Sequence, residues 1–219
     1  MATARSFVLV SLVLTTVLVG TATAQEATQI TNADELDDVR EDLGGEYVLA
    51  DDVDLSEDPS FEPIGDGDEA FTGRFDGGGN VITGLSVVRP GEDYVGLFGA
   101  VGSDGVVTQV GLEGVEVEGG ERVGGVAGSS RGNVTDTYVD GTVSGEGDYV
   151  GGLVGWNRGF VERSYSLAGV TGRLDVGGVE HDLVVETVRD QLAPFAPSVE
   201  MGDRTVVHEN VLLDDRGAL

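Results

Sequence analysis

The sequence contains no cysteine among its 219 residues, and it also contains no lysine. The absence of cysteine excludes disulfide bonds, thiolate metal sites and a lipid-modified cysteine anchor. The two histidines, His181 and His208, have no partner histidine at a metal-ligand spacing.

Positive charge is scarce as well. The twelve basic residues, all arginine, stand against 40 acidic residues, and the formal net charge is −28. Nucleic-acid binding requires cationic side chains that displace counterions from phosphates, so this balance excludes DNA and RNA as partners. The lysine-free acidic composition resembles that of proteins from salt-loving archaea, whose surfaces are suited to high salt because the Debye length falls to about 3 Å at 1 M. A cation-binding surface is the other interpretation of the acidity.

A hydrophobic run of bilayer-spanning length is also absent. The apolar run from Phe7 to Val19 is shorter than the roughly 20 residues that a membrane-spanning helix needs. It follows Arg5 and precedes Ala22-Thr23-Ala24, so we expect residues 1–24 to be a signal peptide cleaved after Ala24, with an uncleaved anchor as the alternative. The sequence therefore predicts a secreted, extracellular or cell-surface protein without a stable membrane span after cleavage.

Glycine, in contrast, is abundant, and it marks a repeat. Val150–Val161 (VGGLVGWNRGFV) has a near twin at Val123–Val134 (VGGVAGSSRGNV), displaced by 27 residues. The same offset pairs Tyr138 with Tyr165, and Tyr94–Gly99 is an earlier copy. Val176-Gly177-Gly178-Val179 is interpreted as a degraded later copy. A period near 27 predicts a solenoid in which Val123/Val150, Val134/Val161 and Tyr138/Tyr165 stack about 4.8 Å apart.

The flanking segments are predicted to close the ends of the stack. Residues 30–45 have the pattern of one short helix, in which Asn32 is the N-cap and Leu36, Val39 and Leu43 share a face. The expected organisation is a signal peptide (1–24), a linker and capping helix (25–45), a β-solenoid (46–180) and a C-terminal cap or tail (181–219). Val184, Val188 and Leu192 recur at helical spacing, although Val184-Val185 fits a strand equally well.

An ordered series of motifs carries a family resemblance. Pro63-Ile64-Gly65, Phe71–Gly77 (FTGRFDG), Ile82–Leu85 (ITGL) and Gly96–Gly99 (GLFG) precede the two Val-Gly-Gly repeats. Together they resemble the GLUG-repeat family of secreted proteins. The resemblance implies an all-β, right-handed parallel β-solenoid of the kind used in surface proteins, adhesins and modules flanking secreted enzymes. That family has no agreed catalytic residues.

Two functional classes remain open from the residues themselves. An enzyme acting on polysaccharides on such a scaffold needs carboxylates and a cation. Asp76, Asp136, Asp140 and Glu162 are the candidate carboxylates, and Arg131, Arg158 and Arg163 are the candidate cations. Because Arg131 and Arg158 occupy the same repeat position, they are better explained as a ladder than as part of one unique active site.

The favoured class is a non-catalytic module that binds a glycan or a cell-surface protein, with a structural spacer or surface-layer role as a further alternative. Stacked coils offer a face on which Tyr149, Trp156, Arg158 and Tyr165 are the candidate binding residues. No cofactor is required. Calcium is a candidate ligand of Asp66, Asp68 and Glu69, although a solvated acidic loop explains them as well. Asn133, in Asn133-Val134-Thr135, is a candidate N-glycosylation site at an expected turn.

Overall fold

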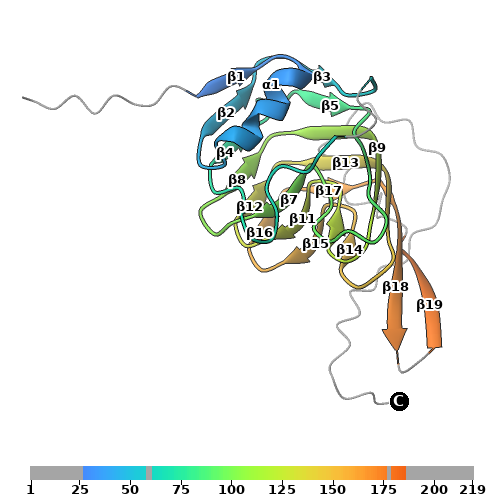
Figure 1. The fold of residues 1–219 in the computed structure, drawn as a ribbon. Helices are drawn as coiled ribbons and strands as arrows, with labels where there is room; N and C mark the ends of the chain where they lie inside the picture. Colours follow the sequence, from blue (N-terminus) through green and yellow to red (C-terminus); the bar gives the residue numbers. More distant parts are fainter. Residues whose placement is uncertain (1–26, 58–60, 177–178, 186–219) are drawn as a thin grey trace, which may run out of the picture.

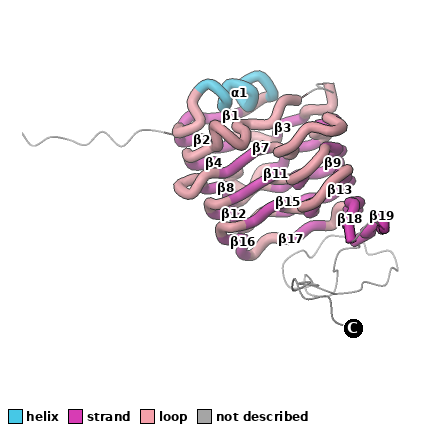
Figure 2. The backbone as a smooth tube through the Cα atoms, turned by 60° about the horizontal axis from the view of Figure 1, so that its bottom comes forward, coloured by secondary structure: helices cyan, strands magenta, loops and turns pink. Residues whose placement is uncertain are grey.

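The computed structural model describes residues 27–57, 61–176 and 179–185, with side chains described up to Gly172. The chain forms a parallel β-solenoid of about five turns with one short α-helix, which confirms the predicted all-β solenoid. Figure 2 shows the turns stacked in parallel, with the helix at one end of the stack and the last two strands at the other.

Parallel sheets run along the length of the stack (Figure 1). The first sheet consists of β1 (Thr28–Ile30), β2 (Glu46–Leu49), β4 (Arg74–Asp76), β8 (Val106–Thr108), β12 (Asn133–Thr135) and β16 (Phe160–Glu162). The central three-stranded sheet consists of β7 (Phe98–Val101), β11 (Ala127–Ser130) and β15 (Val154–Asn157), and β10 (Val123–Gly124) pairs with β14 (Val150–Gly151).

The remaining strands form the largest sheet. It contains β3 (Val53–Asp54), β5 (Val81–Thr83), β9 (Gly111–Gly119), β13 (Tyr138–Gly145), β18 (Gly169–Val176) and β19 (Val179–Val185), while β6 (Ser86–Val88) pairs with β9 and β17 (Tyr165–Ser166) pairs with β13.

The predicted ladders are confirmed residue by residue. Val123 pairs with Val150, Val134 with Val161, and Tyr138 with Tyr165, each across adjacent turns. The offset of 27 residues holds in the later turns but not in the earlier ones, where Arg74 pairs with Val106. The register also shifts within β9, where Val139 pairs with Leu112 but Gly141 pairs with Val115. One extra residue of the earlier turns therefore lies inside a strand, and the others lie between strands.

The core is a single column inside the stack. In its N-terminal half the column is aromatic: the Phe98 ring lies 4.9 Å from Phe71 and 5.5 Å from Phe75, measured between centroids, and all three side chains are fully buried. In later turns valine and alanine replace these rings, as at Val107, Val134 and Ala127. Alternation of buried and exposed positions along β9 shows how each strand places one face in this column.

The N-terminal helix is shorter than predicted. α1 spans Ala33–Asp37 and continues as the 3₁₀ helix η1 (Asp38–Glu41), whereas Ile30 belongs to β1 and is fully buried opposite Leu49. The predicted cap is confirmed: the Asn32 side chain accepts a hydrogen bond from the Glu35 backbone N–H at 3.0 Å. Leu36 and Val39 are buried in the core, so the helix closes this end of the column.

The C-terminal end corrects the predicted fourth copy. β18 and β19 pair antiparallel, with Val176 opposite Val179 and Val170 opposite Val185. Two residues between paired positions are typical of an antiparallel hairpin and too few for a parallel crossover, so this Val-Gly-Gly-Val segment does not start another turn. Val184 and Val185 lie in a strand, while Val188 and Leu192 fall outside the described residues.

Candidate functional site

One corner of the solenoid carries three left-handed residues in register. Tyr94, Arg122 and Tyr149 have φ of 63°, 56° and 65°, and each precedes a valine of the ladder Val95, Val123 and Val150. A non-glycine residue in this conformation costs roughly 1–2 kcal/mol, so favourable contacts of the side chains must offset that cost. The sequence did not reveal these corners, because none of them is a glycine.

The contacts that hold this corner are made by Arg122. Its guanidinium carbon lies 5.0 Å from the Tyr94 ring centroid, 5.8 Å from that of Tyr149 and 5.7 Å from that of Trp156. Its Nη1 also approaches Asp93 Oδ2 at 3.6 Å and Glu121 Oε2 at 3.5 Å. A guanidinium against aromatic faces is stabilised by cation–π attraction of about 0.5–2 kcal/mol, so Arg122 fixes the three rings.

Trp156 and Arg158 extend this arrangement along β15. The Trp156 ring lies 6.3 Å from Tyr149, tilted by 58°, and the Arg158 guanidinium carbon lies 4.3 Å from the Trp156 centroid. Tyr149 is 49% exposed, Arg158 is exposed and Trp156 is half-buried. We call Tyr94, Arg122, Tyr149, Trp156 and Arg158 the aromatic–arginine cluster. It brings three of the four predicted binding residues together.

Tyr165, the fourth predicted residue, lies elsewhere. It is on β17 in the largest sheet, where its ring stacks on Tyr138, and no contact with the aromatic–arginine cluster is found among the described residues. The Tyr138 hydroxyl donates to Glu113 Oε1 at 2.6 Å. Burial raises the pKa of Tyr165, and the pKa of Tyr138 is raised by burial and then by the carboxylate of Glu113. These tyrosines form a second, separate ladder.

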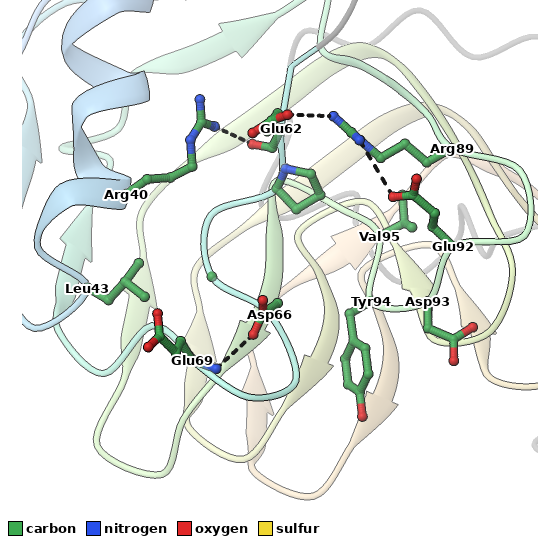
Figure 3. A pocket seen from close by; sticks show the side chains of 12 residues that line it. Arg40, Leu43, Glu62, Asp66, Glu69, Arg89, Glu92, Asp93, Tyr94 and Val95 are labelled. Atoms are coloured by element: carbon green, nitrogen blue, oxygen red, sulfur yellow. Dashed lines mark hydrogen bonds and ion pairs between the residues drawn. The ribbon is translucent and has the colours of Figure 1, made fainter.

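A cavity of about 330 Å³ lies beside Tyr94, between the loops that carry Glu62 to Glu69 and Arg89 to Val95. Figure 3 shows Arg40 and Arg89 pointing toward Glu62 from two sides. The Arg89 guanidinium pairs with Glu62 at 3.4 Å and with Glu92 at 3.5 Å. The lining carries two arginines among five carboxylates, and those arginines already make bonds within the protein.

The predicted calcium loop also borders this cavity. Asp66 Oδ1 accepts backbone hydrogen bonds from Asp68 at 2.8 Å and Glu69 at 2.7 Å, so the carboxylate closes its own turn (Figure 3). Within the described part of the chain, no group of three or more acidic or histidine side chains is arranged to hold a metal ion. The geometry therefore gives the loop a structural role, and calcium binding there stays an untested expectation.

The structure brings together three of the candidate catalytic residues, but as an ion-pair network. Arg163 donates to both carboxylate oxygens of Asp136 at 2.7 Å and lies 3.3 Å from Glu162. The Arg163 hydrogen bonds lower the pKa of Asp136, so this carboxylate stays ionised and is poorly suited to donate a proton. Asp76 is paired with Arg74 at 2.8 Å, and Asp140 is exposed on β13.

The remaining predicted positions lie either in strands or outside the described residues. Asn133 is exposed but begins strand β12 instead of lying in a turn, because its backbone N–H donates to Gly105 as part of the ladder. The predicted cleavage site at Ala24 and His208 lie outside the described residues, and His181 lies in β19. The described residues contain no helix long and apolar enough to cross a membrane.

Known proteins resemble this chain in sequence over about half of its length, and a solved structure resembles it in fold. No protein-family model matches the chain, so the GLUG resemblance stays an expectation. Halomucin of Haloquadratum walsbyi is 39% identical over 133 residues, which cover 54% of this chain and 2% of halomucin. A "Putative Gly-rich membrane protein" of Evansella cellulosilytica is 38% identical over 123 residues, covering 52% of this chain and 14% of that protein. The chain thus spans a small fraction of the length of these relatives.

Among solved structures, the chain resembles a "putative immunoglobulin A1 protease" from Bacteroides ovatus. The TM-score is 0.55 at 20% identity, and the match covers 67% of this chain and 49% of the other. At this identity the likeness supports the solenoid fold and carries no inference about chemistry.

Proposed function

We propose that this protein is a non-catalytic recognition module at the cell surface, which binds glycan chains through the aromatic–arginine cluster. The observation that carries the proposal is the grouping of Tyr149 and Arg158 on either side of Trp156 in β15, with Tyr149 and Arg158 exposed. Aromatic rings with an apolar face and a polar edge are suited to pack against sugar rings, while a guanidinium supplies several hydrogen-bond donors in a fixed plane.

Contacts within the protein hold the cluster in place. Arg122 contacts three rings from inside the corner, and Trp156 lies on a strand paired through Ser129 to the preceding turn. A binding face that is already ordered loses little side-chain entropy on association, which favours affinity. This arrangement supports a binding role more than a purely structural spacer.

Catalysis is less well supported by the same geometry. A polysaccharide hydrolase or lyase needs a carboxyl group able to exchange a proton near neutral pH. Asp136 has a lowered pKa and is held by Arg163, and Asp76 is paired with Arg74. The ion pairs explain these residues without a reaction.

The surface location rests on sequence likeness and composition. One relative is named a membrane protein, and both relatives are far longer than the matching segment. A net charge of −28 suits a protein exposed to concentrated salt, where short screening lengths reduce self-repulsion. These points support an extracellular module within a surface protein.

Retention on immobilised polysaccharides, followed together with release of new chain ends, tests the proposal. In about 1 M KCl, where charge repulsion is screened, we expect retention without new chain ends. Trp156→Ala should abolish retention, Trp156→Phe should restore part of it, and Phe160→Ala should leave it unchanged, since Phe160 is 68% exposed but outside the cluster. New chain ends in proportion to protein would establish an enzyme, and failure to retain any glycan would favour the spacer role.

A further inference from the structure

Two arginines differ from all others whose side chains are described. Five of those seven form ion pairs with acidic side chains: Arg40 with Asp37, Arg74 with Asp76, Arg89 with Glu62 and Glu92, Arg122 with Asp93 and Glu121, and Arg163 with Asp136 and Glu162. Arg131 and Arg158 make no ion pair with any described residue. In a chain with 40 acidic residues, an arginine without such a partner is the exception.

These two arginines are equivalent positions of successive turns. Each arginine follows a strand of the central sheet and precedes a strand of the first sheet. Ser130 pairs with Asn157 just before the two arginines, and Asn133 pairs with Phe160 just after them. Their backbones therefore lie about 4.8 Å apart, the spacing of adjacent strands. Both side chains are exposed.

The backbone beneath the pair is fixed. The Arg131 N–H donates to the Val101 carbonyl at 2.9 Å, and the Arg158 N–H donates to the Ser130 carbonyl at 2.7 Å. Gly159 follows Arg158 where any Cβ would overlap the Gly132 backbone, so the two turns pack in direct contact. Because the two side chains leave the backbone at adjacent strand positions, their like charges repel each other, and an anion bound between them would relieve that repulsion.

Arg158 also joins the pair to the aromatic–arginine cluster, because its guanidinium lies over Trp156. A guanidinium recognises carboxylate and sulfate oxygens through paired N–H donors. We propose that Arg131 and Arg158 form an anion site that binds the carboxylate or sulfate ester of an acidic sugar, whose ring packs against Trp156. This inference rests on the proposed glycan-binding function and specifies its ligand as an acidic glycan.

The overall negative charge gives this site an unusual salt dependence. At about 0.01 M ionic strength the protein repels an acidic polymer over about 30 Å, whereas at 1 M salt the repulsion reaches only about 3 Å. Contacts between a guanidinium and an acid group at hydrogen-bond distance are screened less than this long-range repulsion. Acidic glycans should therefore bind more tightly in molar KCl than in dilute buffer, the reverse of a nucleic-acid binder.

Trp156 provides a direct readout, since it is the single tryptophan of the chain and contacts Arg158. The experiment follows its fluorescence in molar KCl during titration with glucuronate, with glucose 6-sulfate and with glucose; comparing the two acids distinguishes a carboxylate from a sulfate ligand. At least one acid should bind about tenfold more tightly than glucose, the factor expected from one charge-assisted hydrogen-bonded contact. Arg158→Gln and Arg131→Gln should each reduce that preference, and the double variant should abolish it. Arg74→Gln, which removes an exposed arginine paired with Asp76, should leave it unchanged.

The outcomes separate this inference from the proposed function. Equal binding of acids and glucose, or a preference that survives the double variant, overturns the anion site even if polysaccharides are still retained through Trp156. Conversely, acid binding that depends on Arg131 and Arg158 supports the anion site even if no polysaccharide is retained, which would overturn only the glycan-binding proposal. No fluorescence response to either acid overturns the anion site.

Discussion

Tyr138 and Tyr165 stack face to face on adjacent turns, with ring centroids 5.4 Å apart and planes inclined by only 10°. The stack continues over Gly111 on the turn before, where a Cβ atom would overlap the Tyr138 ring. The Tyr138 hydroxyl is tied to Glu113, so this ladder combines aromatic packing with a hydrogen bond to a charged group. Such a ladder has consequences for the behaviour of the protein at high pH.

The pKa values of Tyr47, Tyr138 and Tyr165 are all raised, with burial as the first cause in each. A raised pKa in the folded state means that folding favours the neutral phenol. That contribution to stability is present below the unfolded pKa of about 10 and is lost as the pH rises above it. We expect the free energy of unfolding to fall above this pH, as urea titrations would show. Glu113→Gln should let Tyr138 ionise at lower pH, seen as tyrosinate absorbance, and Glu116→Gln should not; an unchanged titration in Glu113→Gln would contradict the assignment.

Direct packing of turns predicts a sharp difference between two glycines of the last turns. A Cβ at Gly159 would overlap the Gly132 carbonyl, whereas at Gly169 the nearest atom is 4.0 Å away. Gly159→Ala should lower the free energy of unfolding by about 1–3 kcal/mol, the usual cost of overpacking. Gly169→Ala, the matched control, should change it by less than about 0.5 kcal/mol. Equal effects in thermal or urea unfolding would contradict the close packing.

Left-handed corners offer a stabilising substitution. Gln109, Asp136 and Arg163 repeat the left-handed conformation at a second corner, with φ of 55°, 55° and 49°, and the Gln109 side chain is exposed. Gln109→Gly should raise the free energy of unfolding by about 0.5–1 kcal/mol, because relief of the left-handed cost outweighs the entropy that glycine loses on folding. Gln109→Ala keeps the strain and serves as the control. A Gln109→Gly protein no more stable than Gln109→Ala would show that the corner is unstrained.

Glu116 and Glu118 on β9 have no acidic residue opposite them on either neighbouring strand. Glu116 on β9 has Ser86 on one neighbouring strand and Thr142 on the other, and Glu118 has Val88 and Ser144. Thr142→Glu would place a carboxylate directly beside Glu116, and such a pair costs about 0.2–1 kcal/mol. Relative to Thr142→Gln, we expect this loss in dilute buffer and its disappearance in molar KCl. A loss that is independent of salt would indicate a steric cause.

The architecture was predictable from the repeat, because side chains that stack on identical neighbours leave a visible period. Val123, Val134 and Tyr138 were paired with their partners 27 residues later, and the structure has those registers. The earlier turns were harder, since their loops change length and hide the period. The sequence predicts another turn where the structure has the hairpin of β18 and β19, because Val-Gly-Gly-Val fits both the repeat and a tight antiparallel connection.

The site was only partly predictable. The sequence predicts Tyr149, Trp156 and Arg158 as binding residues, but it does not predict Tyr94 and Arg122, which belong to earlier copies. Alignment of the copies does contain the signal: the residue before each Val-Gly step is Tyr94, Arg122 and Tyr149, a cation between two aromatics. That these residues adopt left-handed conformations depends on contacts between turns, which local sequence does not encode.

The constant register of the later turns means that the length of the stack depends on the number of units. Each 27-residue unit adds about 4.8 Å to that length and leaves the packing within the other units unchanged, because turns touch only their immediate neighbours. Gain or loss of a unit would therefore change the separation between the capped end and the aromatic–arginine cluster in fixed steps, without redesign of either.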